Sequence, residues 1–221
     1  MEQLSLLASS RRGGKRKGAG RKAVVPGRQR HERRGDHQRH HPVHVVLRVV
    51  KDVPRLRNGK LHAVLRGAFA AASGETFRLV HYSVQGNHLH LIVEAEDQLA
   101  LARGMQGLAI RIARGINGRV GRKGKVFFDR YFPRAMTVPQ QVRRGLVYVL
   151  NNYLHHERDL KRIQGPVDPY SSAAHFDGWL HALSPYAARQ AGEPICPPAR
   201  TWLLTTGWQR HGKLLFKERP A

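Results

Sequence analysis

Residues 87–94 read NHLHLIVE, and this stretch decides how the fold is interpreted. Two histidines, His88 and His90, stand one residue apart in a segment whose other residues are typical of a buried strand. Side chains alternate along a strand, so both imidazoles lie on one face and the intervening leucines lie on the other. We therefore expect a two-faced strand, with an apolar face in a helix-covered core and a histidine face directed away from it.

The flanking periodicity places this strand in a regular order of elements. Apolar alternation and turn residues predict a hairpin between this strand and the one before it, and three- and four-residue apolar spacing predicts helices. The order strand, helix, strand, strand, helix, strand predicts an α+β, ferredoxin-like βαββαβ antiparallel sheet with helices on one face and the other face available for a ligand. The expected strands cover 43–50, 77–84, 88–95 and 126–136, and the expected helices cover 60–73, a longer segment capped by Asp97, and 139–157.

Composition divides the chain into three expected parts. Residues 1–41 are rich in arginine, lysine, glycine and histidine and predict a disordered basic arm. Residues 42–165 hold the predicted sheet and the helix that follows it. Residues 166–221 form a C-terminal extension that we expect to be partly helical, with a last helix over 201–211.

Net charge indicates the class of partner. The 221 residues carry a formal net charge of +24, which favours a polyanion, and nucleic acid is the first candidate. An anionic membrane surface fits less well, because the basic residues are spread through arm, loop and helix rather than along one amphipathic face. No apolar run of about 18 residues predicts a membrane span. A single cysteine, Cys196, and no signal-like N-terminus favour a reducing, cytoplasmic setting.

The spacing of His88 and His90 lets two nitrogens converge on one metal ion. The alternative is a chance pair on a half-exposed strand, which fourteen histidines in the chain make more frequent. A set of imidazoles and one amide oxygen suits catalytic Mg²⁺ or Mn²⁺, although imidazole also suits zinc. A cysteine-based zinc site is excluded by the cysteine count.

The predicted helix over 139–157 carries a tyrosine on a polar edge. Tyr148 and Asn152 are one turn apart on that edge, with Arg144 one turn before them and His155 and His156 after them. The alternative for Tyr148 is an exposed tyrosine on a surface helix. The apolar stripe that we expect to pack on the domain comprises Val142, Leu146, Val149, Leu150 and Tyr153.

A phenol is a weak nucleophile until its phenolate is stabilised, which a divalent cation and nearby arginines achieve. The pattern therefore predicts a tyrosine that attacks a phosphodiester held over a His–His metal. Six basic residues are expected to hold phosphates: Lys123, Lys125, Arg130, Arg134, Arg143 and Arg144. Three aromatic residues are candidates for stacking on unpaired bases or, alternatively, for the core: Phe128, Tyr131 and Phe132.

Three segments resemble one known family in order and spacing. GNHLHLIVE (86–94) resembles the HUH motif of single-tyrosine HUH nucleases, FFDRYF (127–132) follows it, and YVLNN (148–152) resembles the Tyr-x-x-x-Asn motif of REP-associated tyrosine transposases. These are relatives of the insertion-sequence transposases that move as single strands. The resemblance covers roughly residues 42–180. One departure is Tyr153, which stands where the family often has proline and is a second-choice nucleophile.

The resemblance implies a function and assigns roles. Tyr148 would be the nucleophile that makes a 5′-phosphotyrosine link to single-stranded DNA and frees a 3′-hydroxyl. His88, His90 and Asn152 would ligate a divalent metal, Mg²⁺ or Mn²⁺. The family uses a ferredoxin-like domain and binds hairpins in palindromic repeats or at transposon ends. The resemblance also implies a bacterial protein associated with the nucleoid, and it leaves monomer and homodimer open.

A non-catalytic protein that binds single-stranded DNA or RNA on its sheet is the competing hypothesis. It predicts that removal of the Tyr148 hydroxyl leaves every activity intact. The enzyme hypothesis predicts a covalent protein–DNA adduct that Tyr148→Phe abolishes while DNA binding survives.

Overall fold

The computed structural model describes residues 35–156, 161, 163 and 165–220. The expected basic arm, 1–41, therefore lies mostly outside the described residues. The chain divides into the units Met1–Arg33 and Arg34–Ala221, and every element below belongs to the second unit.

Four strands form one antiparallel sheet in the order β2-β3-β1-β4. The strands are β1 (Val43–Arg48), β2 (Phe77–Val84), β3 (His88–Ala95) and β4 (Phe132–Ala135). This strand order, with the helices described below, confirms the predicted ferredoxin-like arrangement. The predicted bounds of β2 and β3 match the structure.

The fourth strand is shorter than the predicted segment 126–136. Phe127 makes only an isolated bridge to Val49, and the regular ladder with β1 begins at Phe132. Pro133 lies within β4 and donates no hydrogen bond, which is tolerated because β4 is an edge strand.

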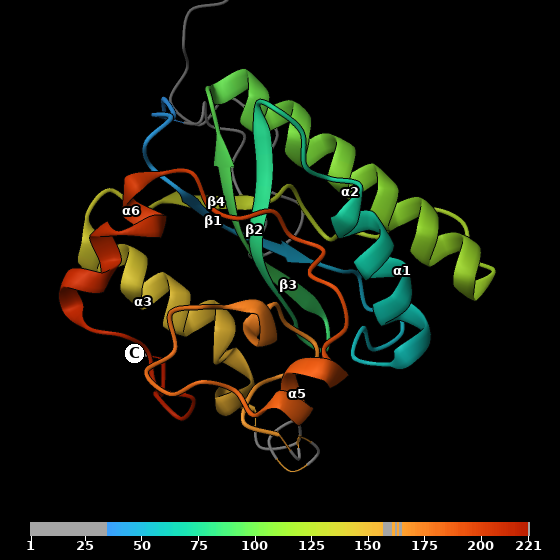
Figure 1. Ribbon diagram of the computed structural model, residues 1–221. Helices are drawn as coiled ribbons and strands as arrows, with labels where there is room; N and C mark the ends of the chain where they lie inside the picture. The colour runs from blue at the N-terminus through green and yellow to red at the C-terminus, as the bar shows by residue number, and fades with distance from the viewer. Residues whose placement is uncertain (1–34, 157–160, 162, 164, 221) are drawn as a thin grey trace, which may run out of the picture. The chain divides into compact units, whose positions relative to one another are not determined.

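Helices α1 (Gly59–Ala70) and α2 (Gln98–Val120) lie on one side of the sheet (Figure 1). The Asn58 side chain accepts a hydrogen bond from the Leu61 amide, and the Asp97 side chain accepts one from the Ala100 amide, so each helix begins at a side-chain cap. Their apolar stripes and the inward residues of the strands form a first core that includes Val45, Leu47, Leu65, Leu89, Leu91 and Leu108.

The opposite side of the sheet is partly covered by α3 (Pro139–Leu150) and by residues 165–220, called the C-terminal segment below (Figure 1). Short elements follow α3: η1 (Asn152–His155), η2 (Ala173–His175), α5 (Pro185–Gln190), α6 (Trp202–Thr205) and η3 (Gly207–His211). Residues of α3, η2, α6 and η3 form a second core with the sheet residues Val80 and Ile92. The ligand face expected to be open is therefore only partly open.

The predicted helix 139–157 was too long. Pro139 begins α3 as expected, but α3 ends at Leu150 and a 3₁₀ turn carries the next four residues. The break is fixed by Asn151, whose Nδ2 donates to the carbonyls of Leu215 and Glu218 at 3.0 and 2.9 Å. Likewise, the last helix expected over 201–211 is split into α6 and η3.

Within the described part of the chain, no helix is both long and apolar enough to cross a membrane.

Candidate active site

His88 and His90 point to the α3 side of the sheet, as the alternation predicts. His90 is paired across the ladder with Val46, and His88 is paired with Arg48. Leu89 and Leu91 are fully buried on the opposite face, in the core with α1 and α2. The two imidazole centroids are 4.7 Å apart.

Each histidine is engaged through the same ring nitrogen. His88 Nδ1 is 2.8 Å from Asn87 Oδ1, and His90 Nδ1 is 3.2 Å from Nε2 of His44 on β1. In both rings Nε2 is therefore the nitrogen left for a ligand. His90 is 3% exposed, and its Nε2 is buried with no hydrogen-bond partner among the residues that the structure describes.

Tyr148 lies edge-on against His90 and His44. Its ring centroid is 5.0 Å from that of His90 and 5.5 Å from that of His44. α3 carries it there because Val142, Leu146, Val149 and Leu150 are buried in the second core, which turns the Tyr148 edge of the helix toward the histidines. Helix and strand belong to one chain, so the phenol and the imidazoles meet without a partner subunit.

Asn152 follows Tyr148 on the 3₁₀ turn η1. It is 2% exposed, and its Oδ1 is buried without a hydrogen-bond partner in the described part of the chain. A buried amide oxygen left unbonded costs about 1–3 kcal/mol. Tyr153, the second-choice nucleophile, is instead 4% exposed, and its hydroxyl donates to the Pro166 carbonyl at 3.4 Å.

The residues present fit a divalent cation. Two unoccupied imidazole nitrogens and one amide oxygen form a mixed nitrogen–oxygen donor set, in which His90 Nε2 and Asn152 Oδ1 are buried and orphaned. Among the described residues, no group of three or more His, Cys, Asp or Glu side chains is arranged to hold a metal ion. A third protein ligand from this part of the chain would therefore be of another residue type, and the Asn152 amide oxygen is a candidate.

Burial keeps the site imidazoles neutral. Desolvation lowers the pKa of His88 and of His44 to about 4, with further lowering from His156 and Arg48 at His88 and from Arg134 at His44. Desolvation and the three neighbouring histidines lower the pKa of His90 to about 2. Neutral rings at pH 7 retain the lone pair that a metal or a hydrogen-bond donor requires.

The predicted phosphate-binding residues are placed differently from one another. Arg134 is exposed on β4, opposite His44 in the ladder, and Arg144 is exposed one turn before Tyr148. Arg143 is engaged by the C-terminal segment, with Glu218 and with the Gly212 carbonyl at 2.9 Å. Lys123, Lys125 and Arg130 are exposed on the loop between α2 and β4.

The three candidate stacking aromatics also differ. Tyr131 is 9% exposed and belongs to the first core, so the core alternative is correct for it. Phe128 is half-buried near the Lys125 ammonium. Phe132 is 51% exposed and is paired with Val46, which places it on the Tyr148 side of the sheet.

Sequence reasoning missed two residues at this site. His44 on β1 contacts both His90 and Tyr148, and Arg48, at the end of β1, is opposite His88. The sequence did contain a signal for them. In VHVVLR (43–48), His44, Val46 and Arg48 are two residues apart, so their side chains lie on the same face of the strand. The register between β1 and β3, which brings that face to the histidines, is not readable from one strand.

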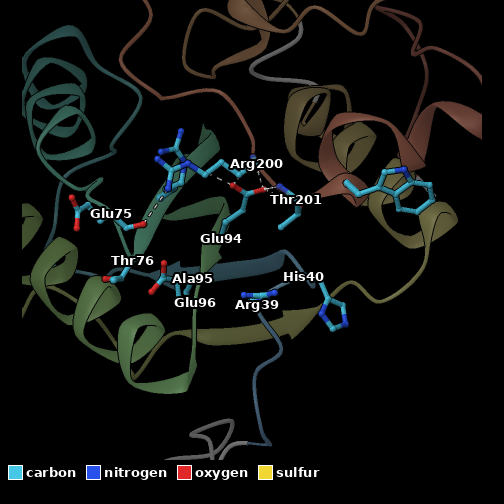
Figure 2. Close-up of a pocket in the computed structure, with 11 residues that line it drawn as sticks. Arg39, His40, Glu75, Thr76, Glu94, Ala95, Glu96, Arg200 and Thr201 are labelled. Carbon is cyan, nitrogen blue, oxygen red and sulfur yellow. Dashed lines mark hydrogen bonds and ion pairs between the residues drawn. The ribbon is translucent and has the colours of Figure 1, made fainter.

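A cavity of about 320 Å³ lies at the other end of β3 and is lined by Glu94 (Figure 2). The Glu94 carboxylate accepts hydrogen bonds from the amides of Arg200 and Thr201 and from the Thr201 hydroxyl. Because Thr201 caps α6, these bonds attach the C-terminal segment to the sheet. This cavity is separate from the histidine–tyrosine cluster in its lining residues.

Comparisons with known proteins give a structural likeness but no match to a family model or a curated protein. A solved structure described as a REP-associated tyrosine transposase bound to a REP hairpin is similar to this chain at a TM-score of 0.46 and 13% sequence identity. The match covers 78% of this chain and 93% of that one. At this level of similarity, the function has to be inferred from this chain's own residues.

Proposed function

We propose that the protein is a metal-dependent single-stranded DNA transposase or nuclease that cuts and rejoins DNA through a phosphotyrosine. The observation that supports it best is the convergence of Tyr148 with His90, at 5.0 Å between ring centroids, beside two buried orphaned ligand atoms. His90 Nε2 and Asn152 Oδ1 lack partners among the described residues, and a bound cation would satisfy both atoms.

The proposed step is an exchange of phosphoester bonds. The Tyr148 oxygen attacks the phosphorus of a DNA phosphodiester, forms a bond to it and displaces the 3′ oxygen of the preceding nucleotide. The products are a 5′-phosphotyrosine and a free 3′-hydroxyl, which takes up the proton that the phenol releases. Attack by a 3′-hydroxyl on the same phosphorus reverses the step and rejoins DNA.

His88, His90 and Asn152 would hold the cation, Mg²⁺ or Mn²⁺. When bound, such a cation lowers the cost of phenolate charge and polarises a phosphoryl oxygen. Arg134 and Arg144 are exposed near the site and are suited to hold the phosphates on either side of the cut. We further propose that the recognised DNA is a hairpin with single-stranded flanks, as the resemblance to REP-associated tyrosine transposases implies.

The competing function is nucleic-acid binding without catalysis. It accounts for the net charge of +24 and for the sheet. It gives no reason for the Tyr148 phenol to lie against the His90 and His44 imidazoles, with an unpaired Asn152 amide oxygen on the turn that follows, and we therefore favour the enzyme.

Covalent trapping tests the proposal. The full chain is incubated with Mn²⁺ and hairpin oligonucleotides that have single-stranded flanks, one set labelled at the 5′ end and one at the 3′ end. We expect a denaturation-resistant conjugate that retains only the 3′ label, because the protein keeps the 5′ phosphate of the downstream strand. The upstream fragment should carry a free 3′-hydroxyl that a polymerase extends.

Two matched variants sharpen the assay. Tyr148→Phe should lose the conjugate and keep oligonucleotide affinity, whereas Tyr153→Phe should form the conjugate because that residue lies in the core. No conjugate with any flanked hairpin, while binding is intact, would favour the non-catalytic function.

A further inference from the structure

Phe132 is an exposed aromatic side chain on the catalytic side of the sheet. It is 51% exposed on β4, and its ladder partner Val46 is also the partner of His90 on the other side of β1. Directly opposed residues share a face, so His90, Val46 and Phe132 form one row across three strands. Adjacent strands are about 4.8 Å apart, which puts Phe132 roughly 10 Å from His90 along that row.

Arg134 extends the same face by one step along the edge strand. It is exposed, and it is the ladder partner of His44, whose pKa its charge helps to lower. An apolar ring and a guanidinium two residues apart on a strand match the alternation of base and phosphate along a single strand. In the described part of the chain, no hydrogen bond or ion pair occupies the Arg134 side chain.

We propose that Phe132 and Arg134 form a subsite for one unpaired nucleotide next to the cut phosphodiester, with the base stacked on Phe132 and its phosphate on Arg134. This proposal rests on the proposed function, because the subsite is placed relative to the phosphodiester that Tyr148 attacks. Its occupant is a base of single-stranded DNA that passes over the edge strand β4 toward Tyr148. Stacking is tolerant of base identity, so this subsite positions the strand rather than reading its sequence.

Position-resolved fluorescence tests the subsite. The cut position is first defined by conjugate formation with the wild-type chain. 2-Aminopurine is then placed at each nucleotide flanking that position, and binding is followed in the Tyr148→Phe background, where the oligonucleotide stays intact. We expect quenching at one or two adjacent positions, its loss in Phe132→Ala and its retention in Phe132→Tyr.

Tyr186→Ala is the matched control, since Tyr186 is 71% exposed on α5 and should leave the quenching unchanged. Equal quenching in Phe132→Ala and its parent would overturn the subsite, even where the wild-type chain forms the conjugate. An absent conjugate with the wild-type chain overturns the proposed function instead.

A different observation concerns His44, which contacts the proposed ligand His90 directly. Their rings are stacked at 5.3 Å between centroids, and His44 Nε2 is 3.2 Å from His90 Nδ1. Histidines that bind metals usually donate their second ring N–H to an acceptor, which fixes the tautomer and the ring orientation. Asn87 Oδ1 is placed to do this for His88, and His44 Nε2 is placed to do it for His90.

We infer that His44 is a positioning residue, which accepts the Nδ1–H of His90 and thereby directs the lone pair of His90 Nε2 toward the cation. This inference also rests on the proposed function, through the cation. It requires that His44 carry its own proton on Nδ1. The role differs from catalysis, because His44 acts through His90.

Manganese affinity, measured by the loss of the free Mn²⁺ electron paramagnetic resonance signal, tests this role without any turnover. His44→Phe keeps the ring volume and removes the acceptor, and we expect about 10- to 100-fold weaker Mn²⁺ binding. His44→Gln offers an amide oxygen at nearly the same reach and should recover much of that loss. Metal-free thermal unfolding shows whether each variant is folded.

Unchanged affinity in folded His44→Phe would overturn the inference, and so would equal losses in the Phe and Gln variants. If the wild-type chain binds no Mn²⁺, the proposed metal site is wrong, and His44 then has no metal ligand to position. Conjugate formation without added metal would show that the reaction needs no cation.

Discussion

Asn151 and Asn152 are adjacent in the sequence, but their side chains differ in the hydrogen bonds that they make. Asn151 uses its Nδ2 to hold the backbone of the C-terminal segment at Leu215 and Glu218. Both side chains have a buried Oδ1 without a hydrogen-bond partner among the described residues, but for Asn152 no Nδ2 bond of this kind is present in that part of the chain. The first is an anchor, and the second is suited to be a ligand.

Substitution of the two asparagines should therefore give opposite results. Asn151→Ala removes two buried hydrogen bonds and is expected to lower the free energy of unfolding by about 1–3 kcal/mol, measured by urea denaturation without metal. Asn152→Ala removes an unpaired oxygen, so we expect little or no loss of metal-free stability and weaker Mn²⁺ binding. A lower free energy of unfolding for Asn152→Ala than for Asn151→Ala would contradict these separate roles.

The sequence predicted the residues of the site better than their surroundings. His88, His90 and Tyr148 were identifiable because parity on a strand and spacing on a helix follow from backbone geometry. His44 and Arg48 were missed because their place depends on which strand pairs with β3, and in which register. Arg143 was expected to contact phosphate, yet its partner Glu218 is 75 residues away in the sequence.

At the scale of elements, α3 depends on the C-terminal segment for its position. Arg143 on α3 forms an ion pair with Glu218, and Trp208 of η3 is 1% exposed in the core that α3 shares. The element that carries Tyr148 is thus packed between the sheet and the chain's last residues.

Loss of the Glu218 carboxylate charge should loosen this contact. Glu218→Gln is expected to lower the free energy of unfolding by about 1–3 kcal/mol, because a charge-assisted pair with the half-buried Arg143 is weakened. Glu96→Gln is the matched control, since Glu96 is exposed and its side chain makes no hydrogen bond or ion pair with another described residue. Equal stability of Glu218→Gln and wild type in chemical denaturation would contradict the account.

Helix ends were predictable where a local signal exists. Asp97 marks the start of α2, and Pro139 marks the start of α3, since caps and first-turn proline act within a few residues. The end of α3 was missed because Asn151 is bonded to residues about 65 positions later. The fourth strand was overextended because the chain pairs with β1 at Phe127, leaves it, and pairs again only from Phe132.

Across the whole molecule, partly buried histidines make stability sensitive to acid. Desolvation lowers the pKa of His81 to about 4, where it packs against Phe176 and lies 3.2 Å from the Ser172 hydroxyl. The unfolded chain takes up this proton near pH 6.5 and the folded chain only near pH 4. Stability is therefore lost as the pH falls from about 6.5 toward 4, and none of this loss occurs above pH 7.

Between pH 7 and pH 5, protonation of His81 in the unfolded chain should lower the free energy of unfolding by up to about 2 kcal/mol. His81→Gln does not titrate and should reduce the pH 7 to pH 5 difference by that amount in urea unfolding. His181→Gln, which replaces an exposed histidine, should leave the difference unchanged. If His81→Gln shows the same pH 7 to pH 5 difference as the wild type, the protonation of His81 does not destabilise the folded chain.

The net charge of +24 predicts a strong salt dependence of DNA binding. The logarithm of the association constant should fall linearly with the logarithm of salt concentration, and a chain without residues 1–34 should show a shallower slope. Conjugate formation by that shortened chain should persist at low salt, because the site lies within 44–156. Equal slopes for the two chains would show that the basic arm makes no phosphate contacts.

The most direct measurement is peptide mapping of the trapped conjugate. Protein crosslinked to a flanked hairpin in Mn²⁺ is digested with nuclease and protease, and the nucleotide-bearing peptide is sequenced by mass spectrometry. The account predicts a single nucleotide-modified residue, Tyr148, joined through a phosphotyrosine bond. A conjugate at Tyr153 or at any other residue would contradict it.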